Sequence, residues 1–310
     1  MPSFIQVIVL SVVQGLAELL PVSSSAHVVV AEKLMGLDPT SPQMTLLLVM
    51  LHTGTMFAVI AYFWKTWRRT YFANADAFKR FAIRVIWATV LTGVIGEVIK
   101  KIIEKTAFRG APKAEIELLF GRLDLIAPAL LAAGVIILIA GLRERSRMKA
   151  ATEDFRTSVT MRQAGWIGAV QGLALPFRGF SRSGSTISTG MLAGASRERA
   201  ERFSFALAVV LTPPVVFVEA MRLVKASHGA SASCPVDLHG SVLASVLGMV
   251  FSFLAGLVAL RWLSSWLEQG RWWLFGVYCV LASCFVFALH TQEYRLPAPP
   301  PHCLVAMYSE

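Results

Sequence analysis

Long apolar runs alternate along the chain with short clusters of charged residues, a pattern that predicts membrane-spanning helices. A helix of about 18–20 apolar residues is long enough to cross a hydrocarbon core of about 30 Å. Six segments of this kind occur, and all but the second are built around an uncharged run. They are about 45–64, 83–103, 123–142, 203–222, 241–260 and 272–290. The fourth contains Pro213 and Pro214, which a buried membrane helix tolerates as a kink.

Two further apolar runs, 4–20 and 164–177, are too short for a full crossing and end in polar turns. The first runs into Pro-Val-Ser-Ser-Ser, and the second into Phe-Ser-Arg-Ser-Gly. The five residues VQGLA occur in both, at 13–17 and at 170–174. Short apolar helices broken by polar backbone are typical of re-entrant segments, which survive at membrane depth only where protein surrounds them. We therefore expect re-entrant hairpins over 4–44 and 162–196.

Composition agrees with a membrane protein and excludes a soluble domain. The chain is 55% hydrophobic and 15% charged, and its mean hydropathy is +0.62. The net charge of +10 does not indicate nucleic-acid binding, because Lys and Arg cluster between the apolar runs, near 65–84 and 143–162. Such clusters set membrane topology and contact anionic headgroups. The four cysteines show no spacing typical of a metal site.

Loop charges predict an orientation and, with it, an inverted repeat. With the two large basic clusters on the cytoplasmic side, the first hairpin opens to the outside and the second to the cytoplasm. The loop 104–117 fits this scheme poorly, because Lys105, Arg109 and Lys113 then lie outside. Each half consists of one hairpin and three spans. Since three crossings reverse the direction of the chain, the halves have opposite topology.

The predicted fold is therefore an all-α polytopic membrane protein with an inverted-topology repeat. The first repeat occupies 1–142 and the second 162–290. A basic cytoplasmic loop, 143–161, joins them, and 291–310 form a proline-rich tail. Inverted repeats place broken helices tip to tip near the middle of the membrane, so we expect the two polar turns to meet there.

The first polar turn carries groups suited to a cation and to proton transfer. Gln14 and Glu18 are four residues apart and share one helical face. Carboxylate and amide oxygens are ligands for hard divalent cations such as Mg²⁺ or Ca²⁺. Hydroxyls at Ser23 and Ser24 and the imidazole of His27 follow within the same turn.

The second polar turn suits a phosphate. Arg182 is flanked by hydroxyls, and glycines on either side free the backbone. Arginine binds phosphate oxygens with two parallel N–H groups, and a new helix start adds backbone donors. The hydroxyl groups concerned are those of Ser181, Ser183 and Thr186. Together the two turns predict a metal-assisted phosphate site that opens into the membrane.

Each of these features also has a purely structural interpretation. A Gln and a Glu on one face can join helices, and serines after a proline often cap a helix. Charged groups inside a membrane are costly and usually functional, which favours Glu18 and Arg182 as site residues. For His52 the sequence leaves two alternatives open, a place in the site or packing against Gly54.

The two motifs resemble those of the bacitracin-resistance type of undecaprenyl-diphosphatase, integral membrane enzymes of the bacterial envelope. That family carries (E/Q)xxxE running into PVSSxxH, followed later by PGxSRSGxT. The first motif is matched by Gln14, Glu18, Pro21, Ser23, Ser24 and His27. The second is matched by Gly179, Ser181, Arg182, Ser183, Gly184 and Thr186. The resemblance extends to about residue 290.

The resemblance implies removal of the terminal phosphate of undecaprenyl diphosphate with the help of a divalent cation. The product is the lipid carrier for cell-wall synthesis, and the enzyme lies in the bacterial inner membrane. The loop charges predict that its site faces the outer side. Glu18, Ser24, His27 and Arg182 are the expected catalytic residues; Glu18 and Gln14 hold the metal. Phosphate binding is expected from Ser23, Ser181, Ser183 and Thr186. Either Ser24 or an activated water is the nucleophile.

This sequence departs from the family pattern at three positions. Gln14 stands where Glu is commoner, which weakens a metal site with two carboxylates. Ala26 replaces a common Gly, and Arg178 replaces the Pro of the second motif. Arg178 adds a second phosphate contact or faces lipid headgroups, and the sequence favours neither alternative.

Other functions compete with this one. Inverted repeats with broken helices are typical of transporters, so a flippase for the lipid carrier is the main alternative, and a bifunctional protein is a third. The phosphatidic-acid-phosphatase type is excluded, because it requires a second histidine shortly after its Ser-Arg. Here the next histidine after Arg182 is His228. Membrane lipids and a homodimer are the other partners that we consider.

Overall fold

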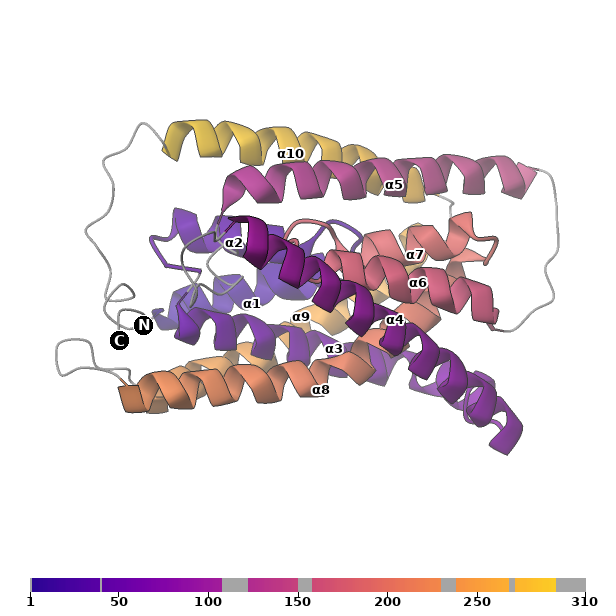
Figure 1. Ribbon diagram of the computed structural model, residues 1–310, viewed down its shortest axis with the longest axis horizontal. Coiled ribbons are helices and arrows are strands. Elements are labelled where there is room, and N and C mark those ends of the chain that lie inside the picture. The colour runs from indigo at the N-terminus through magenta and orange to yellow at the C-terminus, as the bar shows by residue number, and fades with distance from the viewer. Residues whose placement is uncertain are drawn as a thin grey trace.

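The computed structural model describes residues 2–39, 41–107, 122–149, 158–229, 238–267 and 271–293, and all regular elements in these ranges are α-helices (Figure 1). The helices are α1 (Phe4–Leu19), α2 (Ser24–Leu34), α3 (Pro42–Thr70), α4 (Ala75–Ala107), α5 (Leu123–Lys149), α6 (Met161–Ala174), α7 (Arg182–Leu192), α8 (Arg197–Gly229), α9 (Leu238–Leu267) and α10 (Trp272–Glu293). The all-α prediction is confirmed for these residues.

Six of these helices, α3, α4, α5, α8, α9 and α10, are long and apolar enough to cross a membrane. They coincide with the six predicted spans, which confirms a polytopic membrane protein. Several helices extend beyond the apolar runs: α8 begins at Arg197, and α5 continues to Lys149. Pro213 and Pro214 lie inside α8 without ending it. A membrane helix can absorb such residues because neighbouring helices satisfy the freed backbone groups.

The four short helices form two pairs between the long ones (Figure 1). In the view of Figure 1, α5 and α10 lie side by side at the top, and α3, α8 and α9 form the lower layer. The pair α1–α2 and the pair α6–α7 occupy the space between these layers. Helix α1 packs on α9 from the second half of the chain, whereas α6 packs on α4 from the first half.

The glycine of the repeated VQGLA segment explains these two close contacts. A Cβ on Gly15 would lie 2.5 Å from the Cβ of Ala255 on α9. A Cβ on Gly172 would lie 2.6 Å from the carbonyl oxygen of Thr92 on α4. Both distances are far below van der Waals contact, so any larger residue would push the helices apart. The repeated glycine therefore serves helix packing in both copies.

Basic residues from both halves gather at one end of the bundle. Tyr71, which directly follows α3, is buried, and burial raises its pKa to about 12. The positive charges of Arg202 on α8 and Arg84 on α4 oppose that rise. The end of α3 and the N-terminal parts of α4 and α8 therefore lie close together, with basic residues of both halves at this end of the bundle.

Several predicted segments lie partly or wholly outside the described residues. These are most of the loop 104–117, the centre of the basic loop 143–161 and nearly all of the tail 291–310.

Candidate functional site

The two polar turns share one unusual backbone conformation. Ser23, before α2, has φ 67° and ψ 82°, and Ser181, before α7, has φ 46° and ψ 82°. In the described residues these are the two non-glycine positions with positive φ. Serine avoids this region, and residues held there cluster at functional sites. Each turn leads into an 11-residue helix that is followed by a positive-φ glycine, Gly36 or Gly194.

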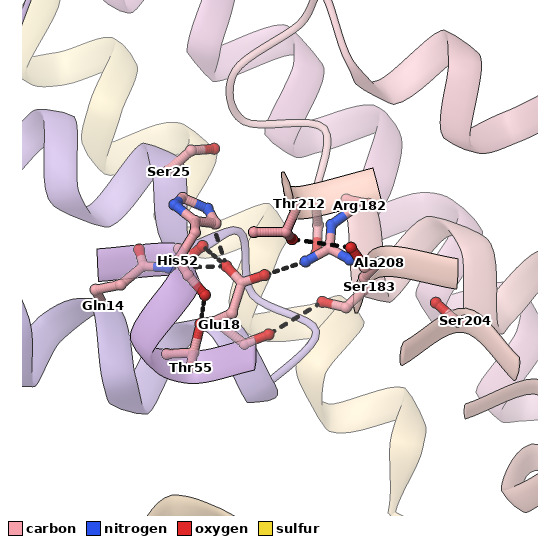
Figure 2. Close-up of polar contacts among 12 residues, drawn as sticks. Gln14, Glu18, Ser25, His52, Thr55, Arg182, Ser183, Ser204, Ala208 and Thr212 are labelled. Atoms are coloured by element: carbon pink, nitrogen blue, oxygen red, sulfur yellow. Dashed lines mark hydrogen bonds and ion pairs between the residues drawn. The ribbon is translucent and has the colours of Figure 1, made fainter. Parts of the chain in front are cut away.

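Glu18, at the end of α1, is the centre at which the two turns meet (Figure 2). Its side chain is only 5% exposed. The hydroxyl of Ser24 donates to Oε2, and Gln14 Nε2 donates to the same oxygen at 3.0 Å. From the second turn, Arg182 Nη2 contacts Glu18 Oε1. A carboxylate from the first turn and a guanidinium from the second thus form a mostly buried ion pair.

The hydroxyls of the second turn have partners within the protein. Ser183 Oγ donates to the carbonyl of Glu18 at 3.4 Å, which joins α7 to α1. Thr186 Oγ1 donates to the carbonyl of Arg182 at 2.7 Å and lies 2.6 Å from Ser204 Oγ on α8. Ser181 Oγ accepts from Gly184 N at 3.3 Å. The predicted phosphate ligands Ser181, Ser183 and Thr186 therefore surround Arg182, although phosphate binding by them stays a prediction.

The two remaining serines of the first turn lie beside Ser24. Ser23 Oγ and Ser25 Oγ are 3.4 Å apart. Ser23 is buried, and the carbonyl of the same residue binds His27. Phosphate binding by Ser23 stays a prediction.

His27 lies on α2 and contacts α10. Its Nδ1 is 2.8 Å from the carbonyl of Ser23, and its Nε2 is 2.6 Å from the hydroxyl of Tyr278. The two rings are stacked with centroids 5.7 Å apart. Because a carbonyl can only accept, Nδ1 carries a proton, and in the neutral ring Nε2 accepts from Tyr278. None of the described hydrogen bonds links His27 to Glu18, so its role in proton transfer stays a prediction.

His52, on α3, is a residue whose place the sequence alone left undecided. Its Nε2 lies 3.2 Å from Glu18 Oε2, and its Nδ1 lies 2.8 Å from the carbonyl of Leu48 (Figure 2). Of the two alternatives, a place in the site is the correct one. Gly54 packs elsewhere, against the backbone of Met249 on α9. The available signal was the cost of placing a histidine inside an uncharged span.

Two residues of α10, Tyr278 and Cys279, support the first turn and were not predicted. Tyr278 binds His27, and the thiol of Cys279 donates to the carbonyl of Pro21 at 3.4 Å. Neither belongs to a motif, and each sits in an apolar span where tyrosine and cysteine are ordinary. No sequence signal distinguishes them.

Arg178, the departure in the second motif, lies within electrostatic reach of Glu32 on α2. Glu32 is 1% exposed. A nearby opposite charge lowers the cost of burying a carboxylate, so Arg178 of the second turn favours the charged form of Glu32 in the first hairpin. This interaction is a third alternative to the phosphate and headgroup contacts that the sequence suggested.

A divalent cation fits this site if other oxygens complete its coordination. The described residues contain no group of three or more His, Cys, Asp or Glu that could hold a metal ion. Glu18 supplies one carboxylate, and Gln14 Oε1 is fully buried without a hydrogen-bond partner. Such an orphaned oxygen is a candidate ligand. Magnesium commonly binds through one or two carboxylates together with substrate phosphate oxygens.

Comparison with known proteins gives near-complete matches. The family model described as bacitracin resistance protein BacA matches residues 7–285. Undecaprenyl-diphosphatase 2 of Acinetobacter baylyi is 54% identical over 285 residues, which cover 92% of this chain and 97% of that protein. Undecaprenyl-diphosphatase 2 of Burkholderia ambifaria and undecaprenyl-diphosphatase 1 of Burkholderia pseudomallei are each 33% identical, covering 91% of this chain and 96% of those proteins.

Proposed function

Because the chain belongs to the bacitracin resistance protein BacA family, we propose that it is an undecaprenyl-diphosphatase. The reaction hydrolyses the terminal phosphate of undecaprenyl diphosphate and yields the monophosphate lipid carrier for cell-wall synthesis. The observation that carries this proposal is the meeting of Glu18, Ser24 and Arg182 between the two turns. These three side chains supply a base, a hydroxyl and a phosphate-binding cation at one place in a membrane protein.

The fold is an inverted-topology repeat in which α1–α2 and α6–α7 are re-entrant hairpins. Three observations support this part of the proposal. Helix α1 packs on α9, and α6 packs on α4, which is the fourth helix of its half as α9 is of the second. Both contacts are made at the glycine of VQGLA, Gly15 or Gly172. The spanning helices α3 and α8 pack together, as do α5 and α10. Both turns have a left-handed serine before a helix of equal length.

The membrane is the bacterial inner membrane, and the site faces its outer side. The basic residues near Tyr71 support a cytoplasmic location for the opposite end of the bundle.

Arg182 and the surrounding hydroxyls bind the diphosphate. The planar guanidinium donates to two phosphate oxygens at once and stabilises the charge that develops on them. We assign further phosphate contacts to the hydroxyls of Ser181, Ser183 and Thr186, which surround Arg182, together with Ser23 of the first turn. Glu18 holds Arg182 in position before the substrate arrives.

Ser24 is the nucleophile. Its hydroxyl donates to Glu18 Oε2, the arrangement in which a carboxylate accepts the proton of an attacking hydroxyl. Attack on the terminal phosphorus breaks the bond to the bridging oxygen and releases undecaprenyl phosphate. Water then hydrolyses the phosphoserine and releases phosphate. His27 transfers a proton during these steps, with Tyr278 fixing its ring. A water activated by Glu18 is the alternative nucleophile.

Gln14 and Glu18 hold a divalent cation, Mg²⁺ or Ca²⁺. Such an ion, when bound, neutralises charge on the bridging and terminal oxygens. The single carboxylate and the unpartnered Gln14 oxygen support this assignment.

The decisive experiment measures phosphate release from undecaprenyl diphosphate by the detergent-purified protein, with and without EDTA, beside Arg182→Ala. We expect release that depends on both the cation and Arg182. Release without EDTA sensitivity would remove the cation from the proposal. No release from folded wild type, in a detergent in which a related enzyme is active, would contradict the proposal itself.

The second candidate function is transport of the polyprenyl phosphate carrier. The paired broken helices favour it, because transporters use the same arrangement. Transport needs no phosphate release, so translocation of the lipid in vesicles by an Arg182→Ala variant that releases no phosphate would support this function.

A further inference from the structure

The Nε2 of His52 faces Oε2 of Glu18, and in neutral histidine both atoms would accept hydrogen bonds. The carbonyl of Leu48 can only accept, so the Nδ1 that lies 2.8 Å away carries a proton. In neutral histidine Nε2 then has a lone pair, and this atom lies 3.2 Å from Glu18 Oε2. A lone pair and a carboxylate oxygen repel each other at that distance. A proton on Nε2, or a metal ion bound by both atoms, would remove this repulsion.

Gln14 contributes a third group to the same place. Its Nε2 lies 3.0 Å from the Glu18 oxygen that faces His52, and its Oε1 is fully buried without a partner. The oxygen and nitrogen of an amide are assigned from their hydrogen bonds. A half-turn of this amide would give Oε1 a place beside Glu18, next to His52. Three potential ligands from α1 and α3 are thus adjacent.

The backbone around His52 is held firmly. A Cβ on Gly54 would collide with the carbonyl of Met249, so α3 and α9 are in direct backbone contact at this level. Ser252 Oγ on α9 donates to the carbonyl of Leu51 at 2.9 Å. Metal-binding histidines usually donate their other N–H to a carbonyl, as His52 does with Leu48. The imidazole is therefore positioned before any ion binds.

We propose that His52 is a ligand of the divalent cation, beside Glu18 and Gln14, and that it makes the site prefer Mn²⁺ over Ca²⁺. The proposal rests on the cation site of the proposed function. Calcium takes oxygen ligands, whereas imidazole nitrogen suits transition metals. A neutral imidazole also supplies a strong ligand where Gln14 offers only an uncharged amide oxygen.

The test uses electron spin echo spectroscopy on the full-length protein in detergent, loaded with Mn²⁺, because this method detects a directly bound histidine nitrogen. His52→Asn is the informative variant, since the asparagine amide can still donate to Leu48 but has no atom at the position of Nε2. His27→Asn and His239→Asn are matched controls, one near the first turn and one at the exposed start of α9.

We expect a nitrogen coupling in wild type and in both controls, and its loss in His52→Asn. The Kd for Mn²⁺ should rise in that variant by at least about 10–100-fold, the loss typical of removing a group that only orients a metal ligand. His52→Gln, which places an amide oxygen near the former Nε2, should lower the preference for Mn²⁺ over Ca²⁺. This second variant also carries the test if His52→Asn fails to fold.

Three results would overturn the proposal: a coupling that persists in His52→Asn, a wild type that binds Mn²⁺ without any nitrogen coupling, or a wild type that binds no Mn²⁺. Phosphate release from the same samples separates this proposal from the proposed function. Turnover without a nitrogen coupling would refute only the role of His52. A His52-dependent coupling without turnover would refute only the enzymatic function.

Discussion

The first and second polar turns have nearly the same backbone and opposite chemistry. Ser23 and Ser181 adopt the same left-handed conformation, and each precedes an 11-residue helix. The first turn follows an acid, Glu18, whereas the second leads into a cation, Arg182. The similar backbone of the two turns therefore sets where their side chains lie, and the differences between the turns set their chemistry. A symmetrical site with two acids or two cations would repel itself at this distance.

The difference extends along the hairpins. Counting from the left-handed serine, Glu32 on α2 corresponds to Gly190 on α7. Glu32 is buried within reach of Arg178, while a Cβ on Gly190 would lie 2.8 Å from Ala200 on α8. One hairpin thus has a buried carboxyl group at the position where the other hairpin has a close contact between helices.

Exchange of the two central charges is the strongest way to test whether the turns are equivalent. Glu18→Ala and Arg182→Ala should each lower kcat for phosphate release by at least about 10²–10³-fold. Arg182 stabilises the charge that develops on the phosphate, and Glu18 accepts the proton of the attacking hydroxyl and holds Arg182 in position. The double variant Glu18→Arg with Arg182→Glu should stay inactive. It restores opposite charges, but Gln14 and Ser24 would then face a guanidinium instead of a carboxylate. Recovery of activity in the folded double variant would show that the turns are interchangeable.

Neighbouring serines of the first turn should differ sharply in effect. Ser24→Ala removes the hydroxyl bound to Glu18, and we expect kcat to fall by at least about 100-fold. Ser25→Ala is the control, because the hydroxyl of Ser25 contacts only Ser23, at 3.4 Å, among the described contacts. Its kcat should stay within about 3-fold of wild type, an estimate for loss of a weak polar contact. Equal losses in both variants would argue that the turn needs its shape more than the Ser24 hydroxyl.

The repeated glycines should matter equally in the two halves. Gly15→Ala and Gly172→Ala should each lower the free energy of unfolding by about 1–3 kcal/mol, because the added methyl group overlaps a facing helix. Gly93→Ala on α4 is the control, since a Cβ there meets nothing within 4 Å. It should stabilise the protein by up to about 1 kcal/mol through helix propensity. Thermal unfolding in detergent measures all three. A destabilising effect at only one of the two VQGLA glycines would show that they do not contribute equally to helix packing.

The smallest expected effect concerns Arg178. Arg178→Ala removes the charge that faces Glu32 and should lower stability by about 1 kcal/mol, since the arginine is itself only partly buried. The double variant with Glu32→Gln should recover that loss, and turnover should remain within about 3-fold. A 10-fold or larger fall in turnover at unchanged stability would instead make Arg178 a phosphate contact.

The spanning helices were predictable because an apolar run is visible in the local sequence. The residues at which these helices begin and end were not predictable in this way. An uncharged run such as 125–142 identifies the centre of α5, yet the helix continues to Lys149 through residues that are polar. Likewise α8 includes Arg197 and Arg199, which are buried despite their charge. Long charged side chains at helix ends bury their stems against neighbours, so hydropathy predicts helices that are too short at such ends.

The same limit applies to the site. Glu18, Ser24 and Arg182 lie in motifs whose residue types and spacing indicate their chemistry, and the structure brings them together. His52 and Tyr278 reach the turns from distant spanning helices, and only three-dimensional packing reveals such contacts. His27 shows the converse, since its motif is intact but its described contacts are with Ser23 and Tyr278.

The crossed packing of α1 on α9 and of α6 on α4 bears on how the chain is made. A ribosome releases Gly15 early, but its partner Ala255 emerges only when most of the chain has been synthesised. The first hairpin must therefore wait in the translocation machinery or the lipid without its final neighbour, whereas Gly172 meets Thr92 on a helix already made. Assembly of the first turn is thus a late event of biogenesis, and a chain truncated before α9 cannot complete it.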